Sequence, residues 1–206
     1  MESMLRRLPI VAVFGQGTPI DDNLARLARE AGARVARLGA HLLTGGGYGV
    51  MEAASEGFVA VAERAGFCIG IIPRHPDGPF DQPHRDNDGR PYPNRFVEIS
   101  IMTPLPPRVE DWCTTPGRNH INVLSADAII ALPGNSGTRN ELDMSAEYLG
   151  ERERPREARR VALLGPIERF TEEHRALFVH AATLDEAAAH VRRVLKARGF
   201  RAEDRP

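Results

Sequence analysis

The stretch PIVAVFGQGTPIDDNLARLAREAGARV, residues 9–35, decides the fold class. Its first part, Pro9–Phe14, is a continuous apolar run, which is typical of a parallel strand buried on both faces. The run ends in the tight turn Gly15-Gln16-Gly17. From Leu24 to Val35 apolar residues recur every three or four positions, so we predict a helix that packs one face on a sheet. The stretch is therefore one strand-turn-helix unit of an α/β protein.

Later segments repeat this alternation of strand and helix. Further strands are predicted at His41–Thr44, Phe67–Pro73, Phe96–Met102, Asp127–Leu132, Val161–Leu164 and Leu177–His180. Further helices are predicted at Val50–Ala65 and Asp185–Arg198. Strands that alternate with helices indicate a parallel sheet covered on both faces. The sequence thus predicts one doubly wound, Rossmann-like α/β domain over residues 1–206.

Three segments fall outside this alternation. Residues 74–95 are rich in Pro, Asp, His, Arg and Gly, which favours an inserted loop or lid, while residues 151–160 read as a charged connector and residues 199–206 as a flexible tail. The loop contains side chains of types that bind metals, but their spacing matches no metal motif, so we expect a solvated loop and no metal site. These side chains are His75, Asp77, Asp81, His84 and Asp86.

Charge and hydropathy limit the classes of partner. The formal net charge of the 206 residues is -1 and no long run of like charge occurs, so no nucleic-acid-binding or membrane-attracting surface is expected. No apolar stretch is long enough to cross a bilayer or to form the core of a signal peptide. The two cysteines, Cys68 and Cys113, have no metal or disulfide spacing. We therefore expect a cytoplasmic protein that binds a small molecule.

Lysine usage excludes two enzyme classes. Of the 27 basic residues only Lys196 is a lysine, and it lies in the predicted closing helix. A P-loop needs a lysine directly after its glycine turn, and a pyridoxal enzyme needs a lysine in a pocket to form a Schiff base. Neither class fits this chain.

Glycine-rich turns follow two of the predicted strands and precede helices. One comprises Gly45, Gly46, Gly47 and Gly49, and the other comprises Gly134, Asn135, Ser136, Gly137 and Thr138. Ligands bind beyond the carboxyl ends of parallel strands, where backbone N–H groups and the positive end of a helix attract anions. The hydroxyl groups of Ser136 and Thr138 add donors. The alternative is that these glycines only make tight turns, but two such turns favour a phosphate site.

The turn at Gly15 is weaker, because no third glycine follows at the spacing of a dinucleotide fingerprint. In addition, no acidic residue ends the second strand, where a dinucleotide fold places its ribose-binding carboxylate. We therefore do not expect a nicotinamide dinucleotide site.

Two charged residues near these turns are candidates for catalysis. Glu141 follows Thr138 by three residues, so it either complements the helix dipole as a solvent-facing charge or faces the ligand, where it stabilises positive charge or positions water. Arg118 precedes the strand that leads to the second glycine turn, and the alternative for it is an ordinary surface arginine. Ser136 is not expected to be a nucleophile, because the G-x-S-x-G elbow needs glycine where Thr138 stands.

Three motifs resemble those of the Lonely Guy (LOG) family. They are TGGGYGVMEA at Thr44–Ala53, PGRN at Pro116–Asn119 and PGNSGTRNE at Pro133–Glu141, the last similar to the family motif PGGxGTxxE. The resemblance covers about residues 9–180. Members are often labelled lysine decarboxylases, and the single lysine speaks against that label.

The resemblance implies a phosphoribohydrolase, which cuts the N-glycosidic bond of nucleoside 5′-monophosphates, N6-modified adenine nucleotides included. Glu141 then matches the motif glutamate and Arg118 the essential arginine. The resemblance also implies a homodimer or higher homo-oligomer and no cofactor. A related branch binds nucleotides without known catalysis or carries the molybdenum cofactor as cargo, and this non-catalytic binding remains the alternative.

The chain departs from the family pattern at three places. Asn135 replaces the second glycine of PGG, Asn119 follows Arg118 where the enzymes have lysine, and the loop at 74–95 is long for the family. The pair Arg118-Asn119 is closer to the pattern of the less characterised, nucleotide-binding branch.

Overall fold

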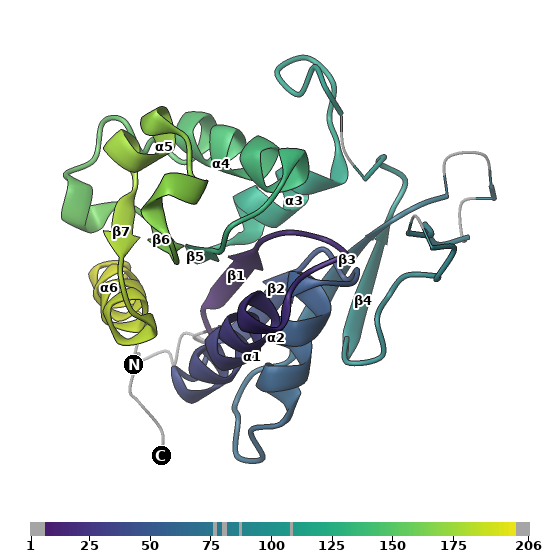
Figure 1. Ribbon diagram of the computed structural model, residues 1–206, viewed down its shortest axis with the longest axis horizontal. Helices are drawn as coiled ribbons and strands as arrows, with labels where there is room; N and C mark the ends of the chain where they lie inside the picture. Colours follow the sequence, from purple (N-terminus) through teal and green to yellow (C-terminus); the bar gives the residue numbers. More distant parts are fainter. Residues whose placement is uncertain (1–6, 76–77, 80–81, 87, 108, 201–206) are drawn as a thin grey trace, which may run out of the picture.

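A seven-stranded sheet forms the centre of the computed structural model, which describes residues 7–75, 78–79, 82–86, 88–107 and 109–200. All neighbouring strands are parallel and follow the order β4-β3-β2-β1-β5-β6-β7 (Figure 1). The strands are β1 Ile10–Phe14, β2 His41–Thr44, β3 Cys68–Pro73, β4 Ile99–Thr103, β5 Ala128–Ala131, β6 Val161–Leu164 and β7 Val179–Ala181. The order is doubly wound, because the chain moves outward from β1 to β4 and then returns to the other side of β1 at β5.

Helices cover both faces of the sheet (Figure 1). Helices α1, α2 and α6 share one apolar core with the sheet, and α3, α4 and α5 lie on the other face. The helices are α1 Asp22–Arg37, α2 Val50–Val59, α3 Arg118–Ser125, α4 Ser136–Tyr148, α5 Glu172–Leu177 and α6 Leu184–Ala197, with short 3-10 turns at Arg156–Ala158 and Ile167–Arg169. The expected doubly wound α/β fold is confirmed.

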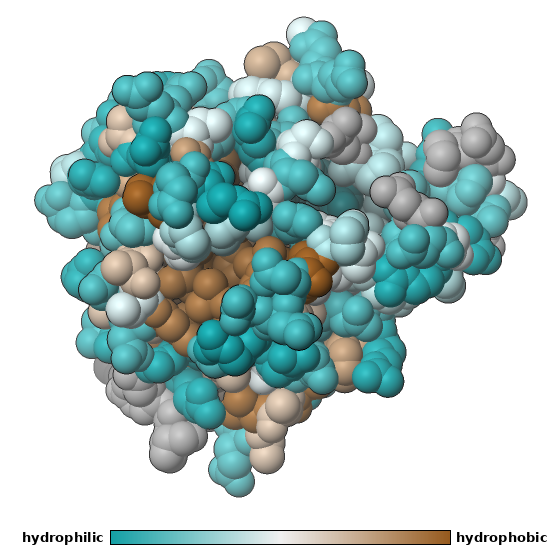
Figure 2. All heavy atoms as spheres, in the orientation of Figure 1, coloured by the Kyte–Doolittle hydropathy of each residue, from teal (hydrophilic) through white to brown (hydrophobic). Residues whose placement is uncertain are grey.

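Strand β1 shows how the sequence makes two cores. Successive side chains of a strand point to opposite faces of the sheet. Val11 and Val13 accordingly enter the core under α1, α2 and α6, while Ala12 and Phe14 enter the core under α3 and α4. Figure 2 shows apolar side chains gathered in a hollow on the face that carries α1 and α6.

Several element boundaries differ from the prediction. Helix α2 ends at Val59 rather than Ala65, because the Arg64 guanidinium donates to the carbonyls of Val59 and Val61 and so satisfies the helix end. Phe200, which we assigned to the flexible tail, packs against the core and lies under the guanidinium of Arg7. Residues 201–206 of that tail lie outside the described residues. No helix in the described part of the chain has the length and apolar character needed to cross a membrane.

The loop predicted at 74–95 is anchored to the glycine turn after β2. Asn94 is buried; its backbone N–H donates to the Gly46 carbonyl at 2.7 Å, and its Nδ2 donates to the Gly47 carbonyl at 2.7 Å. Isolated antiparallel bridges join Arg74 to Pro83 and Arg85 to Pro91. The loop therefore has defined contacts beside the carboxyl ends of the strands.

Candidate functional site

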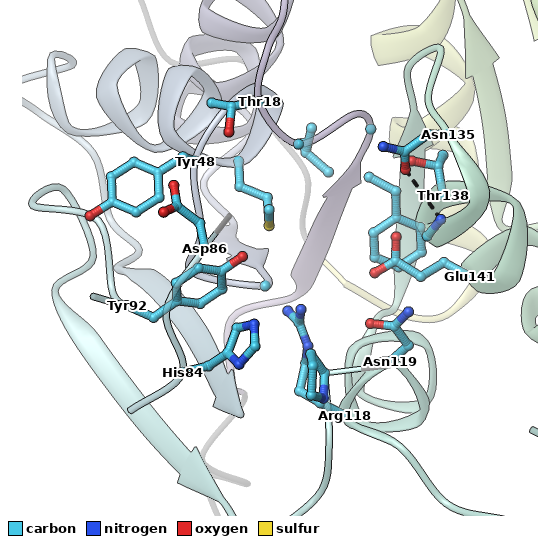
Figure 3. A pocket seen from close by; sticks show the side chains of 18 residues that line it. Thr18, Tyr48, His84, Asp86, Tyr92, Arg118, Asn119, Asn135, Thr138 and Glu141 are labelled. Atoms are coloured by element: carbon cyan, nitrogen blue, oxygen red, sulfur yellow. Dashed lines mark hydrogen bonds between the residues drawn. The ribbon is translucent and has the colours of Figure 1, made fainter. Parts of the chain in front are cut away.

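The candidate site lies where the winding of the sheet reverses. Strands β1 and β5 are neighbours, yet the chain leaves them in opposite directions, and such a switch point leaves a crevice at the carboxyl ends of the strands. A cavity of about 220 Å³ occupies this place (Figure 3). Gly15 after β1, Gly45 after β2 and Thr138 after β5 all line it.

The cavity has two walls and a floor, as Figure 3 shows. We call the side formed by Asn119, Thr138 and Glu141 the helix wall, because these residues belong to α3 and α4. We call the opposite side, formed by Tyr48, His84 and Tyr92, the aromatic wall. Arg118 rises from the floor between the two walls.

The start of α4 faces the cavity. Asn135 is the N-cap, and its Oδ1 accepts a hydrogen bond from the Gly137 N–H at 3.2 Å. Thr138 is only 3% exposed, and its Oγ1 has no hydrogen-bond partner among the described residues. A helix N-terminus with an unpartnered hydroxyl is suited to bind an anion.

Arg118 is the first residue of α3 and is buried. Its backbone N–H donates to the Pro106 carbonyl at 2.8 Å, and Nη1 makes a long contact of 3.4 Å with the Ile71 carbonyl. Its Nε has no partner among the described residues. Burial lowers the pKa of Arg118 from its ordinary value. The surface alternative for this arginine is wrong, because Arg118 is buried and lines the cavity.

Gly45 makes room for that guanidinium. A Cβ at position 45 would lie 1.7 Å from Nη1 of Arg118 and 2.9 Å from Sδ of Met51. Because real Cβ atoms do not approach other atoms so closely, any side chain at position 45 would displace Arg118. Position 45 therefore requires glycine, because the guanidinium of Arg118 lies directly against its backbone.

Glu141 lies in the second turn of α4, and its side chain lines the cavity. Oε1 accepts a hydrogen bond from Nδ2 of Asn122 at 3.0 Å. Burial raises the pKa of Glu141 to about 7, against the opposing effects of the Arg118 charge and the Asn122 hydrogen bond. The solvent-facing alternative is thus wrong, and the carboxyl group titrates near neutral pH beside a buried arginine.

Asn119 connects the two helices of the helix wall. It is buried, lines the cavity and donates through Nδ2 to Oδ1 of Asn140 in α4 at 3.1 Å. This contact fixes the start of α3 against α4, so Arg118 and Glu141 keep their relative positions.

The remaining predicted binding residues lie behind the cavity or beside it. In the first glycine turn, the Gly46 N–H donates to Oγ1 of Thr44, and the N–H of Val50 at the start of α2 donates to the Gln16 carbonyl. Those two donors therefore serve the protein itself. Of the predicted residues, those that do not line the cavity are Gly46, Gly47, Gly49, Gly134 and Ser136. Gly134 and Ser136 line two separate depressions along α4.

The aromatic wall was missed by the sequence analysis. His84 and Asp86 drew notice only as metal-binding types, and no cluster of three metal-binding side chains occurs in the described ranges. Asp77 and Asp81 lie outside the described residues. The tyrosine inside the turn Gly45–Gly49 was a signal for an aromatic contact that we did not use.

Asp86 holds the loop rather than presenting a free charge. Its Oδ2 accepts from Nε of Arg90 at 2.7 Å, and its Oδ1 accepts from the backbone N–H groups of Asp88 and Arg90. Burial alone would raise the pKa of Asp86, but these bonds and the Arg90 charge outweigh it and lower that pKa. The charged groups of the cavity that remain for a ligand are Arg118 and Glu141.

Three buried polar atoms around the cavity have no partner within the described part of the chain. They are Nε of Arg118, Oγ1 of Thr138 and Nδ1 of His84. Buried polar groups in proteins are nearly always hydrogen-bonded, so a cluster of exceptions in one cavity indicates a polar ligand. Fold and cavity together define a doubly wound α/β protein with a small polar cavity at its switch point.

The chain belongs to the SLOG cluster4 family, whose family model matches residues 8–151. A relative from Archaeoglobus fulgidus, described as an uncharacterized protein, is 29% identical over 160 residues, which make up 78% of this chain and 82% of the relative. The family shown is therefore the SLOG cluster4 family, and the LOG family itself stays a resemblance.

Two solved structures are similar over nearly the whole chain. The molybdenum cofactor carrier protein of Chlamydomonas reinhardtii is 28% identical with a TM-score of 0.64, and the match covers 92% of this chain and 99% of the carrier. The molybdenum cofactor binding protein of Rippkaea orientalis is 29% identical with a TM-score of 0.62, covering 92% of this chain and 98% of that protein.

Proposed function

We propose that this protein is a phosphoribohydrolase that cleaves the N-glycosidic bond of a purine nucleoside 5′-monophosphate to the free base and ribose 5-phosphate. The observation that carries the proposal is the convergence of Glu141, Arg118 and the start of α4 on one small polar cavity. Each group fits one need of the reaction, and the three lie within reach of a single mononucleotide.

The 5′-phosphate is placed at the start of α4. Backbone N–H groups of the first helical turn, the unpartnered hydroxyl of Thr138 and the guanidinium of Arg118 all offer donors to the phosphate oxygens. A helix N-terminus and an arginine together are a strong anion site, because charge-assisted hydrogen bonds are about twice as strong as neutral ones.

Glu141 is placed beside the ribose. As the bond from C1′ to the base nitrogen breaks, positive charge develops on the sugar, and a carboxylate stabilises that charge. Water adds to C1′ and loses a proton to the carboxylate of Glu141. The carboxyl group then returns that proton to the base nitrogen, so the base leaves in its neutral form. A carboxyl group whose pKa burial raises to about 7 is well matched to accept and return a proton at neutral pH.

The size of the cavity supports a mononucleotide. A volume of about 220 Å³ is below the range of roughly 300–1,000 Å³ usual for drug-sized ligands, so a dinucleotide would not fit inside. The phosphate and sugar of a mononucleotide would be enclosed, while the base extends toward the aromatic wall.

The test is hydrolysis of a panel of nucleoside monophosphates, AMP and N6-modified AMP included, with free base and ribose 5-phosphate both quantified. Wild-type protein is expected to release both products in equal amounts, and Glu141→Gln is expected to release neither while keeping AMP affinity within a few-fold. Base release by Glu141→Gln at the wild-type rate would refute the role of Glu141.

A second candidate function is carriage of the molybdenum cofactor without turnover. The likeness to the two molybdenum-cofactor proteins favours it, as does Asn119 directly after Arg118. The phosphate of that cofactor would use the same donors of α4. Co-purification of a pterin, together with nucleotide binding that releases no base, would favour the carrier over the hydrolase.

Two properties stay predictions. The first is a homodimer or higher homo-oligomer, which light scattering after gel filtration would test. The second is a cytoplasmic location without a nucleic-acid partner, which cell fractionation and a nucleic-acid binding assay would test.

A further inference from the structure

We propose that His84 and Tyr92 of the aromatic wall bind the planar nitrogen heterocycle of the ligand, and that the loop carrying them therefore selects which ring the protein accepts. This inference rests on the proposed placement of the phosphate at α4. It applies to a purine and to a pterin alike, because both are planar rings edged with nitrogen donors and acceptors.

The two walls divide the chemistry of the cavity. The helix wall and the floor contribute Arg118, Thr138 and Glu141, which suit a phosphate and a sugar. The opposite wall contributes aromatic rings, as Figure 3 shows. A ligand whose phosphate is held at the start of α4 must direct its other end across the cavity, so its ring reaches the aromatic wall.

The rings of the aromatic wall stand edge to face. The centroids of His84 and Tyr92 are 5.4 Å apart at 84°, and those of Tyr48 and Tyr92 are 6.1 Å apart at 76°. In this arrangement the rings support one another without stacking face on face, so a flat heterocycle can stack on a face that they leave uncovered. Stacking of this kind does not distinguish one base from another.

His84 adds a polar contact that can distinguish them. Its Nδ1 is buried and has no partner in the described segments, although the backbone N–H of His84 is bonded to the Pro73 carbonyl. Burial, and then the charges of Arg118 and His75, lower the pKa of His84, while Asp86 acts in the opposite direction. A neutral imidazole has one donor and one acceptor nitrogen, so it can pair with a ring nitrogen of the ligand.

The aromatic wall is held in place before a ligand arrives. The Arg90 guanidinium lies 3.9 Å from the centroid of the Tyr48 ring and donates to Oγ1 of Thr18 at 3.2 Å. The Tyr48 hydroxyl donates to the Pro91 carbonyl at 2.9 Å. A Cβ at Gly47 would lie 2.4 Å from the Tyr92 hydroxyl oxygen, so this glycine lets the tyrosine approach the turn. Such fixed contacts lower the entropy lost on binding.

The experiment compares a ligand that has the ring with one that lacks it. We would measure the Kd of AMP and of ribose 5-phosphate by calorimetry for wild type, His84→Ala and Tyr92→Leu. We expect AMP affinity to fall about tenfold or more in both variants, while ribose 5-phosphate affinity stays within about threefold. Tyr92→Phe, which keeps the ring, should restore most of the AMP affinity lost in Tyr92→Leu.

The matched control is Arg95→Ala, because Arg95 belongs to the same loop but is exposed and does not line the cavity. It should leave both affinities unchanged. AMP affinity that is unchanged in His84→Ala and Tyr92→Leu would overturn the proposal. A parallel loss of ribose 5-phosphate binding would also overturn it, since the wall would then be only structural.

A failure of the proposed function gives a different pattern. If wild-type protein binds AMP but releases no base, hydrolysis is refuted while the ring proposal is tested by the same affinities. If it binds neither phosphate compound, the variants are titrated with adenosine and with neopterin. Weaker binding of adenosine or of neopterin by His84→Ala than by wild type would support the role of the aromatic wall and identify the class of ring. Equal binding by all the proteins, or no binding by any of them, would overturn the proposal.

Discussion

Adding one methyl group at Gly45 should weaken ligand binding far more than it weakens the fold. The new Cβ would lie 1.7 Å from Nη1 of Arg118 and 2.7 Å from its Cζ, whereas carbon and nitrogen atoms in contact need about 3.5 Å. The guanidinium must therefore move by roughly 1.5–2 Å. Gly45 does not have a positive φ, so alanine at this position introduces the clash without backbone strain.

The two expected losses have different sizes. The displaced guanidinium gives up one long hydrogen bond to the Ile71 carbonyl, so the free energy of unfolding should fall by about 1 kcal/mol. A charge-assisted hydrogen bond to a phosphate contributes about 1.5–3 kcal/mol, so the affinity for AMP or ribose 5-phosphate should fall roughly 10- to 150-fold. Calorimetric titration and urea unfolding of the same Gly45→Ala preparation measure both.

Gly17→Ala is the matched control. Gly17 also lines the cavity, has no positive φ, and a Cβ there would meet no atom within 4 Å. Its affinity and stability should stay near the wild-type values. Wild-type affinity in Gly45→Ala would refute the reasoning, because it would mean that the position of Arg118 does not matter for binding. A large loss of stability in Gly45→Ala would equally show that the clash is not relieved by movement of the side chain.

Three further predictions follow from single contacts. Asn135→Gly removes the side chain whose Oδ1 accepts from the Gly137 N–H, and so frees this N–H for a phosphate. Calorimetry should then show several-fold tighter binding of ribose 5-phosphate, while the free energy of unfolding falls by only a few tenths of a kcal/mol. Weaker binding would contradict this prediction. Because burial raises the pKa of Glu141 to about 7, its carboxylate form is lost as pH falls below that value. The kcat/KM for AMP should therefore rise with pH and level off above about 7. A flat pH profile would count against the role of Glu141. Glu151 is fully buried and its pKa is also raised to about 7 from 4.5, so the unfolded chain ionises first and stability falls between these pH values. Glu151→Gln should therefore raise the free energy of unfolding by up to about 3 kcal/mol at pH 8 and leave it unchanged near pH 4. Urea unfolding at the two pH values measures both effects. Equal effects at both pH values would contradict the link between the Glu151 pKa and stability.

The sheet could be predicted because each strand carries its own signal. Runs such as Pro9–Phe14 and Ala128–Leu132 are apolar throughout, and a glycine follows each one within two residues, so strand, turn and direction are all local information. The bounds of helices depend more on distant contacts. Helix α2 stops at Val59 through a bond from Arg64, which apolar periodicity does not reveal.

Half of the candidate site was also predictable. Thr138 and Glu141 lie on one helix after a glycine turn, so their spacing alone placed them together, and the motif added Arg118. The aromatic wall was not predictable in this way. Tyr92 reaches the cavity because Asn94 bonds to the carbonyls of Gly46 and Gly47, and a contact between residues almost fifty positions apart leaves no periodic signal.

The same division separates two questions about function. In the proposed function, turnover depends on Glu141, a helix residue whose carboxyl pKa is raised by burial to about 7. Which ring the protein accepts depends on His84 and Tyr92, which a loop brings to the other side of the cavity. Since phosphate binding requires neither, this site can keep the phosphate while its chemistry and its ring selectivity change independently. Hydrolysis and carriage are therefore two proposals for one site, and variants at Glu141 and at His84 distinguish turnover from recognition.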